Sequence, residues 1–313
     1  MNVLVTGASG FIGHNVLLRA PRSWQVTAIY HNTPGLEEFI RRHALTNVRA
    51  IRCDLTDAAS VAELARERAS FDACLYLAAN GDPGRSADRP AWDLTLNTLG
   101  LVTLLEHVRV GHCVYVSSGA VYDGISGPVT PQTAVAPLLP YAISKLASEH
   151  YLRAFAGRSK TVGSYINVRF FGAYGPYEAE RKITTKWIRA VMGGRREITL
   201  RGNGENLIDF MYVDDAADGF LKLTASAGFS GTVDFASGSP VSVNAVVQTM
   251  AKVLGANVTI RHEGHTEEYI QFHTVDRTMR DRFGVTPSIA FEDGVRRLHE
   301  FLLRERDGAG QPA

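Results

Sequence analysis

The first 170 residues alternate between short apolar runs, which are typical of strands, and stretches whose apolar residues recur with helical spacing. Strands are predicted at residues 2–6, 25–30, 48–53, 73–77, 112–116 and 161–170. Helices are predicted between them at residues 11–20, 36–43, 58–68, 90–109 and 141–156. Strands this apolar must be buried on both faces of the sheet. Helices that connect the strands through right-handed crossovers pack on both faces and bury them. The alternation therefore predicts an α/β fold with a doubly wound parallel sheet, the Rossmann architecture that binds nucleotides.

The pattern changes beyond residue 172, where several glycines and Pro176 divide the sequence into short elements. Two helical stretches are predicted there, at residues 183–191 and 243–254. We interpret residues 1–171 as a dinucleotide-binding domain and residues 172–306 as a smaller substrate-binding lobe.

The border between these two parts is not simple. Residues 210–224 are apolar enough to pack on the first domain, so the lobe is expected to be discontinuous, with about 206–235 packing back on that domain. Residues 307–313 contain two glycines and a proline but no large apolar group. They are expected to form a flexible tail.

Charge and composition limit the partners and the location. Lys and Arg total 33 against 32 Asp and Glu, so a net charge of +1 creates no global field that would attract nucleic acid or an anionic membrane. No apolar run approaches the roughly 18 residues of a membrane span, and the first one ends at Gly7 without a basic lead, which argues against a signal peptide. Three well-separated cysteines suit reduced thiols, and the pair His262 and His265 lacks further ligands at metal-binding spacing. We therefore expect a cytoplasmic protein that contacts neither nucleic acid nor membrane and holds no metal.

Three glycines, Gly7, Gly10 and Gly13, lie at three-residue intervals between the first predicted strand and the first predicted helix. Without side chains the backbone can approach a pyrophosphate closely. The N–H groups at the start of the helix, at Phe11 and Ile12, then stabilise its charge. A plain strand-to-helix turn would also accommodate glycines, but the position after the first strand of a βαβ unit favours dinucleotide binding.

The end of the second predicted strand bears on which dinucleotide is bound. An acidic residue there would bind the adenine ribose of NAD, yet His31 and Asn32 follow this strand and the next carboxylate is Glu37. Both side chains can donate to a 2′-phosphate, although neither is an arginine. NADP and NAD both remain open, with NADP favoured.

Asp54 ends the third predicted strand, in the sequence Cys53-Asp-Leu-Thr-Asp57. In one interpretation, it meets the adenine amino group of the dinucleotide. In the other, Asp54 or Thr56 caps the helix that follows. The sequence leaves both interpretations open.

Tyr141 and Lys145 are four residues apart in a predicted helix and therefore share one face. An enzyme that moves hydride to or from a carbon must also move a proton at its oxygen, and a tyrosine with a pKa near ~10 is a weak base at neutral pH. The Lys145 ammonium is expected to favour the phenolate and to hold the nicotinamide ribose. Ser118 follows a predicted strand and is expected to hydrogen-bond the reacting oxygen. A surface Tyr/Lys pair and a serine that satisfies backbone are the alternatives, which the glycine loop disfavours.

Together these motifs resemble the extended short-chain dehydrogenases/reductases, in particular the NAD-dependent epimerase/dehydratase family, whose members act mainly on nucleotide sugars. The resemblance covers most of the chain and rests on Thr6 to Gly13, Asp54-Leu55, Leu77-Ala-Ala79, Asn97 with Gly100, Val116 to Tyr122, Tyr141 to Lys145, Val168 to Pro176 and Asp209 to Asp215. It implies that Ser118, Tyr141 and Lys145 form a catalytic triad. It also implies that the dinucleotide is lined by Leu55, Leu77, Ala78 and Ala79. Finally, it implies a homodimer formed through the two long helices at 90–109 and 141–156.

Departures from the family pattern bear on the reaction. Dehydratases of the family carry Asp-Glu or a lone Glu beside the triad serine, where this chain has Gly119 and Ala120, so elimination of water is disfavoured. Hydride transfer at a sugar carbon remains, either as a 4-ketoreductase or as a 4-epimerase with tightly bound NAD. The missing carboxylate after the second strand favours the reductase. A non-catalytic module that senses NADP is the alternative from another class.

Two more departures concern the substrate, which the resemblance implies is a nucleoside-diphosphate sugar. Gly172 and Ile208 stand where the family often has an asparagine and an arginine that contact the diphosphate. Other cations would then be needed, and Arg181, Lys182 and Arg201 are the candidates. The alternative is that these cations form a solvated face.

Overall fold

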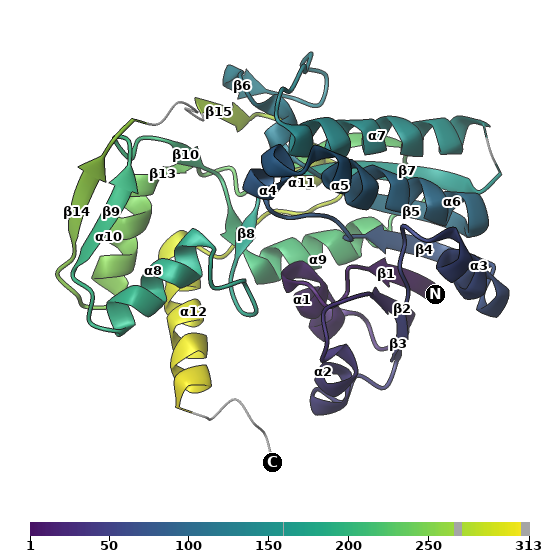
Figure 1. Ribbon diagram of the computed structural model, residues 1–313, viewed down its shortest axis with the longest axis horizontal. Helices are drawn as coiled ribbons and strands as arrows, with labels where there is room; N and C mark the ends of the chain where they lie inside the picture. Colours follow the sequence, from purple (N-terminus) through teal and green to yellow (C-terminus); the bar gives the residue numbers. More distant parts are fainter. Residues whose placement is uncertain (159, 266–270, 308–313) are drawn as a thin grey trace.

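The computed structural model describes residues 1–158, 160–265 and 271–307 of the chain. Its centre is a seven-stranded sheet in the order β12-β7-β5-β4-β1-β2-β3, in which every neighbouring pair is parallel (Figure 1). The strands are β1 (Asn2–Thr6), β2 (Gln25–Tyr30), β3 (Val48–Arg52), β4 (Ser70–Tyr76), β5 (Arg109–Ser118), β7 (Val162–Phe170) and β12 (Gly231–Phe235). The predicted doubly wound sheet is confirmed. The strand order reverses between β1 and β4, which is where such sheets open a crevice for ligands.

Helices cover both faces of the sheet. One face is covered by α1 (Phe11–Arg19), α2 (Leu36–Arg42), α9 (Val213–Thr224) and α11 (Thr278–Asp281). The other is covered by α3 (Ala58–Glu67), α6 (Gly100–His107) and α7 (Pro140–Arg158). Because successive side chains of a strand point to opposite faces, Val3 and Val5 of β1 join the first core and Leu4 joins the second.

The single helix predicted at 90–109 is wrong in two respects. The segment forms three consecutive elements, which are α5 (Pro90–Leu94), the π-helix η1 (Thr95–Leu99) and α6. The π-helix presents Asn97 and Thr98 to α7, where both hydrogen-bond Ser144. The last residue of the prediction, Arg109, begins β5 instead, because the exposed Arg109 lies between buried valines with the period of a strand.

The C-terminal half builds a lobe around a separate apolar core. Its helices are α8 (Ile183–Met192), α10 (Val243–Val253) and α12 (Phe291–Arg306). Its short strands pair β9 (Glu197–Arg201) with β14 (Thr259–Glu263) and β10 (Leu207–Ile208) with β13 (Val241–Ser242). The sequence pattern predicts α8 and α10 but misses α12, although its buried Val295, Leu298 and Leu302 recur with helical spacing.

Residues 206–235 contact both parts of the chain. Within this segment β10 pairs in the lobe, whereas α9 packs against α1 and β12 extends the central sheet. Between them, β11 (Met211–Tyr212) pairs with β8 (Ala173–Tyr174). The division of the chain at residue 171 stays a prediction. The tail predicted at 307–313 lies outside the described residues except for Asp307.

None of the described helices combines the length and the apolar character needed to cross a membrane. The three cysteines are buried and free, and two of them, Cys74 and Cys113, are neighbours on β4 and β5. No group of three or more His, Cys, Asp or Glu side chains in the described parts of the chain is arranged to hold a metal. His262 contacts the side-chain oxygen of Asn244 at 2.9 Å.

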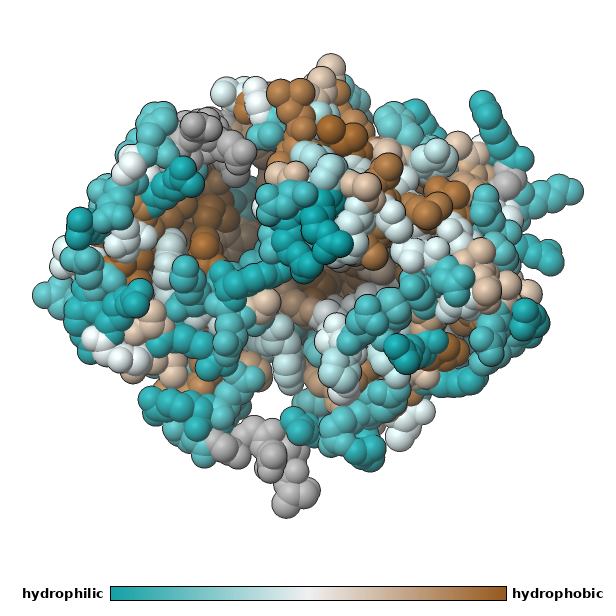
Figure 2. Space-filling view, in the orientation of Figure 1, coloured by the Kyte–Doolittle hydropathy of each residue, from teal (hydrophilic) through white to brown (hydrophobic). Residues whose placement is uncertain are grey.

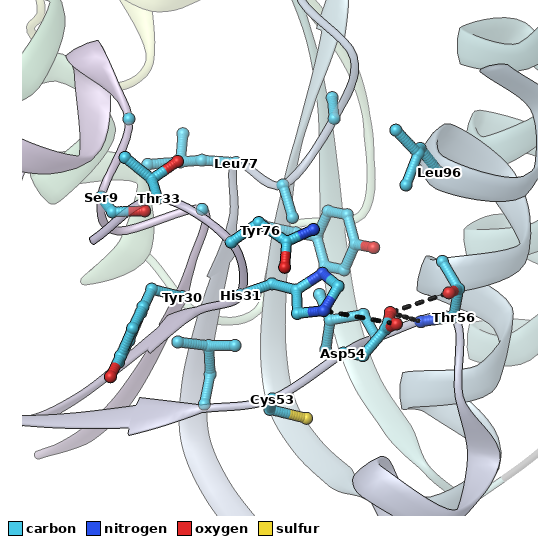
Figure 3. Close-up of a pocket in the computed structure, with 17 residues that line it drawn as sticks. Ser9, Tyr30, His31, Thr33, Cys53, Asp54, Thr56, Tyr76, Leu77 and Leu96 are labelled. Atoms are coloured by element: carbon cyan, nitrogen blue, oxygen red, sulfur yellow. Dashed lines mark hydrogen bonds and ion pairs between the residues drawn. The ribbon is translucent and has the colours of Figure 1, made fainter. Parts of the chain in front are cut away.

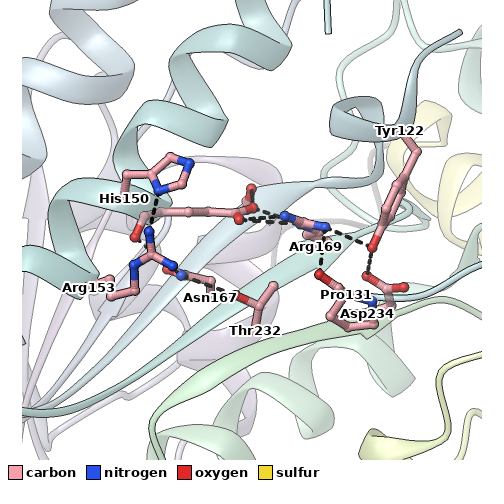
Figure 4. Close-up of polar contacts among 10 residues, drawn as sticks. Tyr122, Pro131, His150, Arg153, Asn167, Arg169, Thr232 and Asp234 are labelled. Carbon is pink, nitrogen blue, oxygen red and sulfur yellow. Dashed lines mark hydrogen bonds and ion pairs between the residues drawn. The ribbon is translucent and has the colours of Figure 1, made fainter. Parts of the chain in front are cut away.

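A chain of buried polar side chains links α7 to the edge of the sheet (Figure 4). The guanidinium of Arg169 on β7 donates to both carboxylate oxygens of Glu149 on α7, with a closest distance of 2.9 Å. It also donates to the hydroxyl of Tyr122, in the 3-10 turn η2 (Gly119–Tyr122), and that hydroxyl donates to Asp234 on β12 at 2.8 Å. The second carboxylate oxygen of Asp234 accepts from Thr274, on β15 (Gln271–Thr274), which pairs with β6 (Ser126–Val129). These hydrogen bonds offset the cost of burying the charges.

Replacing Asp234 by Asn should make stability less dependent on pH. Burial raises the pKa of Asp234 to about 6, although hydrogen bonds from Thr274 and Tyr122 act in the opposite direction. Because an unfolded aspartate titrates near ~3.9, the folded state holds an extra proton between these two pH values and loses stability as the pH rises through them. Asp234→Asn should remove this loss, which is about 3 kcal/mol for a difference of roughly two pKa units.

Urea unfolding of both proteins between pH 4 and pH 7 measures the effect. The free energy of unfolding of Asp234→Asn should rise relative to the wild type as the pH increases. Asp88→Asn, at an exposed aspartate, serves as the control and should run parallel to the wild type. If the free energies of unfolding of Asp234→Asn and of the wild type ran parallel between pH 4 and pH 7, the raised pKa of Asp234 would be contradicted.

Candidate active site

A cavity of about 340 Å³ opens at the carboxyl ends of β1 to β4, at the edge where the strand order reverses (Figure 3). The predicted cofactor residues that line it are Gly7, Gly10, His31, Asn32, Asp54, Leu55, Leu77, Ala78 and Ala79. Other lining residues, which no motif assigns to the cofactor, include Ser9, Thr33, Thr56, Tyr76 and Leu96. These come from the ends of four strands and from η1, so only the tertiary structure brings them to one wall.

The glycines after β1 are required by close backbone contacts. Gly7 has a left-handed φ of +63°, and a Cβ atom there would lie 2.8 Å from the backbone nitrogen of Ala78. At Gly13 a Cβ would lie 2.5 Å from the carbonyl oxygens of Gly7 and Ala8, so only glycine lets α1 begin this close to the loop. Gly10 lines the cavity, where the backbone of a residue without a side chain is open to a ligand.

The start of α1 fits the pyrophosphate of a dinucleotide. Its first turn contains no acidic residue, and its N-cap residue, Gly10, has no side chain that could occupy the first N–H groups. The helix dipole and these N–H groups favour an anion at this point. Phe11, Ile12 and Gly13 belong to this turn and do not line the cavity, so their contribution is backbone and packing.

Asp54 lies in the cavity beside His31, with 3.5 Å between the carboxylate and the imidazole. Its other oxygen accepts from the backbone and hydroxyl of Thr56. Burial acts to raise the pKa of Asp54, but the Thr56 hydrogen bonds and the charge of His31 hold it below its ordinary value. The alternative in which Asp54 or Thr56 caps the next helix is wrong, because Asp57 caps α3 by accepting from two backbone N–H groups.

The structure places an arginine beside the loop that follows β2. Tyr30 of β2 is the register partner of Arg52 of β3, and the Arg52 Nε donates to the carbonyl of His31 at 3.2 Å. The guanidinium is exposed and lies beside His31, a lining residue of the cavity, although Arg52 itself does not line the cavity. The hydroxyl of Tyr30 points away from the cavity in Figure 3 and donates to Glu37, the nearest carboxylate after β2 in sequence.

The three predicted catalytic residues lie on two adjoining elements. Ser118 ends β5, and its hydroxyl accepts from the backbone N–H of Ala120 at 3.1 Å. Tyr141 lies in the first turn of α7, within hydrogen-bond reach of Ser118. One turn further, the Lys145 ammonium donates to the carbonyl of Val116 at 2.9 Å and lies 5.9 Å from the centre of the Tyr141 ring. The structure thus brings the triad together at the carboxyl end of β5, next to β4.

Burial controls the ionisation of this group. It raises the pKa of Tyr141, an effect that the hydrogen bond with Ser118 opposes and the charge of Asp93 increases. Burial also lowers the pKa of Lys145 to about 8, against the charges of Asp93 and Glu149. The acidic phenol expected from the neighbouring Lys145 is not found: the pKa of Tyr141 is raised, because desolvation outweighs the other influences.

The predicted substrate cations occupy two different places. Arg181 and Lys182 precede α8 and reach the segment after β4, where Arg181 approaches the Asp82 carboxylate at 3.4 Å and Lys182 donates to the carbonyl of Gly81. Arg201 lines a separate cavity of about 290 Å³ in the lobe. Its walls are mostly apolar and include Ile183, Trp187, Leu200, Leu207, Ile208 and Val243.

Two features define the class of this protein. The cavity lies where the strand order of a Rossmann sheet reverses, between β1 and β4, and Ser118, Tyr141 and Lys145 are grouped at the end of β5. Together they define a dinucleotide-dependent enzyme of the extended short-chain dehydrogenase/reductase class. The chain belongs to the NAD-dependent epimerase/dehydratase family, whose model matches residues 3–233. The resemblance seen in the sequence is therefore confirmed.

Known relatives and solved structures match along almost the whole chain. The UDP-glucose 4-epimerase of Mycolicibacterium smegmatis is 27% identical over 96% of this chain and 98% of its own length. The dTDP-glucose 4,6-dehydratase of the same organism is 30% identical, with 94% and 91% covered. The structure of MoeE5 in complex with UDP-glucose and NAD superimposes with a TM-score of 0.84 at 26% identity, covering 98% of this chain and all of the other. The UDP-N-acetylglucosamine 4-epimerase of Methanobrevibacter ruminantium M1 shares the fold, with a TM-score of 0.86 at 24% identity and 97% and 98% covered.

Proposed function

We propose that this enzyme is a 4-ketoreductase that uses NADPH to reduce the C4 keto group of a nucleoside-diphosphate sugar. The substrate class follows the names of the relatives, a UDP-glucose 4-epimerase and dTDP-glucose 4,6-dehydratases. The observation that carries the choice of cofactor is Arg52 beside His31, at the end of a strand that offers no carboxylate to a ribose. An arginine at this place suits the 2′-phosphate that distinguishes NADP from NAD.

The ionisation of the triad suits reduction. When bound, the cofactor supplies hydride, and the enzyme must then donate a proton to the oxygen at C4. Tyr141 is the proton donor, since its raised pKa keeps the phenol protonated at neutral pH. The Ser118 hydroxyl, which accepts from Ala120, lies within hydrogen-bond reach of Tyr141 and is placed to hydrogen-bond the substrate oxygen beside it. Lys145, with a pKa of about 8, is mostly charged at neutral pH. Its ammonium holds the cofactor ribose and supplies the positive charge of the triad.

The carboxylates that dehydratases of the family carry directly after the triad serine are replaced here by Gly119 and Ala120. Gly119 and Ala120 occupy the turn η2, and a Cβ atom at Gly119 would already lie 3.2 Å from the ring of Phe171. The turn is therefore packed against an aromatic side chain where a dehydratase needs carboxylates. This favours simple hydride transfer.

A 4-epimerase with tightly bound NAD is the second candidate, and the epimerases among the relatives favour it. It would use the same three side chains, so the triad does not distinguish the two reactions. The cofactor does, because an epimerase regenerates its NAD within each cycle whereas a reductase must exchange NADP for NADPH.

The dimer implied by the family resemblance is part of the proposal. Leu94 and Leu99, on α5 and η1, and Ile143 and Tyr151, on α7, each expose about half of their surface. Figure 2 shows apolar patches over the region where Figure 1 places α5 and α7. Exposed apolar groups on two adjacent helices suit burial against a second copy. We expect a dimer in analytical ultracentrifugation at micromolar concentration, and a monomer there would contradict this part.

Replacing Tyr141 by Phe should abolish turnover of a 4-keto nucleotide sugar while leaving dinucleotide binding intact. Loss of a positioned proton donor costs about 100-fold to 10,000-fold in rate. Steady-state kinetics and a fluorescence titration with NADPH measure the two effects. Tyr151→Phe, which removes a hydroxyl from the same helix and keeps the ring that the proposed dimer would bury, should behave like the wild type. Unimpaired turnover in Tyr141→Phe would refute the catalytic assignment.

Replacing Arg52 by Ala should weaken NADPH binding about 10-fold to 100-fold, the equivalent of one charge-assisted contact, and leave NADH binding unchanged. Isothermal titration with each dinucleotide measures the difference. Arg49→Ala serves as the control, because Arg49 lies on the same strand but pairs with Glu67. An equal loss for both dinucleotides would contradict the NADP assignment. Stoichiometric NAD released from the denatured wild-type protein would instead support the epimerase.

A further inference from the structure

A fully buried carboxylate, that of Asp93, contacts α7 at Ser144, between the triad residues Tyr141 and Lys145. Asp93, on α5, accepts from the side-chain amides of Asn80 at 2.7 Å and Asn97 at 3.0 Å. Its second oxygen accepts from the hydroxyl of Ser144 at 2.6 Å. All of these partners are buried as well, so the contacts exclude water. Burying a carboxylate is costly, and the three hydrogen bonds from neutral donors offset part of that cost.

The partners of Asp93 connect the two halves of the candidate site. Asn80 follows Ala79 of the cofactor cavity, and its backbone N–H donates to the side chain of Asn97 at 2.7 Å. Asn97 in turn donates to Ser144, which stands between Tyr141 and Lys145 on α7. The π-helix makes this possible, because it turns Asn97 toward α7 while the preceding residue lines the cavity.

The charge of Asp93 has no cationic hydrogen-bond partner. Within the described part of the chain, the side chains that donate to it belong to two amides and a hydroxyl, which are neutral. The other buried carboxylate near Lys145, Glu149, is already paired with Arg169. The remaining titratable groups that face Lys145 are the phenols of Tyr141, on its own helix, and Tyr115, on β5 at 5.2 Å from ammonium to ring centre. Among the described residues, Asp93 is thus a buried carboxylate without a cationic partner, and it is joined through Ser144 to the turn of α7 that carries Lys145.

We propose that Asp93 is a positioning residue of the active site, whose carboxylate fixes Ser144 and Asn97 behind the triad and whose charge keeps the Lys145 ammonium protonated. This inference rests on the proposed function for the role of Lys145 in catalysis. It does not depend on the identity of the sugar. The charge of Asp93 raises the pKa of both Lys145 and Tyr141.

The test is to remove the charge and the hydrogen bond separately. Asp93→Asn keeps the size of the side chain and removes its charge, whereas Ser144→Ala removes the 2.6 Å hydrogen bond and leaves the charge. Nuclear magnetic resonance of 13Cε-labelled lysine, with the signal of Lys145 assigned by its loss in Lys145→Met, follows the ionisation without substrate. The pKa of Lys145 should fall by about one unit in Asp93→Asn, as expected on loss of a nearby opposite charge, and stay near that of the wild type in Ser144→Ala.

The pH profile of turnover is the second readout. Without the negative charge of Asp93, the pKa values of Lys145 and Tyr141 both fall, so these groups lose their protons at a lower pH than in the wild type. The alkaline limb of the turnover profile should therefore move to lower pH by about one unit in Asp93→Asn but not in Ser144→Ala. The proposal would be overturned if the pKa of Lys145 were unchanged in Asp93→Asn, or if it shifted equally in Asp93→Asn and Ser144→Ala. If no keto sugar is turned over, the proposed function is refuted. The resonance titration, which needs no substrate, would then still test whether Asp93 sets the pKa of Lys145. If Asp93→Asn does not fold, Asp93→Ser repeats the neutralisation with a smaller side chain.

Discussion

The candidate active site depends on how helix α7 is fixed to the elements around it. Lys145 donates to a backbone carbonyl of β5, and one turn later Glu149 pairs with a guanidinium on β7. On the side facing α5, Ser144 donates to a buried carboxylate. These contacts are directional, and breaking any of them would leave a buried polar or charged group without a partner. They therefore prevent α7 from sliding or rotating, and they hold Tyr141 in reach of the end of β5.

Burial has opposite consequences for the two ionisable members of the triad. It makes the phenol of Tyr141 harder to ionise and makes the ammonium of Lys145 easier to neutralise. The charge of Asp93 opposes the second effect and strengthens the first, so both groups keep their protons. A site in this state is suited to giving a proton to an oxygen, which is the direction that a reductase requires. The departures of Gly119 and Ala120 from the dehydratase pattern agree with this view.

The cofactor end of the site illustrates how strand pairing adds to what local motifs can tell. The loop after β2 contains no arginine, and the sequence therefore offers only His31 and Asn32 as donors to a phosphate. Arg52 comes 21 positions after His31 in the chain, yet it lies beside this loop because β2 and β3 are paired with Tyr30 opposite Arg52. The register of a parallel pair depends on how both strands fit the core, which no single motif reveals.

The sequence by itself determined the alternation of strands and helices, the glycine loop at Gly7 and the placing of Tyr141 and Lys145 on one helix face. These follow from local rules, namely the period of apolar residues, the conformations open to glycine and the spacing of a helical turn. The tertiary structure decided the break of the helix predicted at 90–109, the position of Arg52 and the burial of Asp93 behind the triad. Each of these depends on which distant segments pack together, because the energy of a buried polar group is set by partners that lie far from it in sequence.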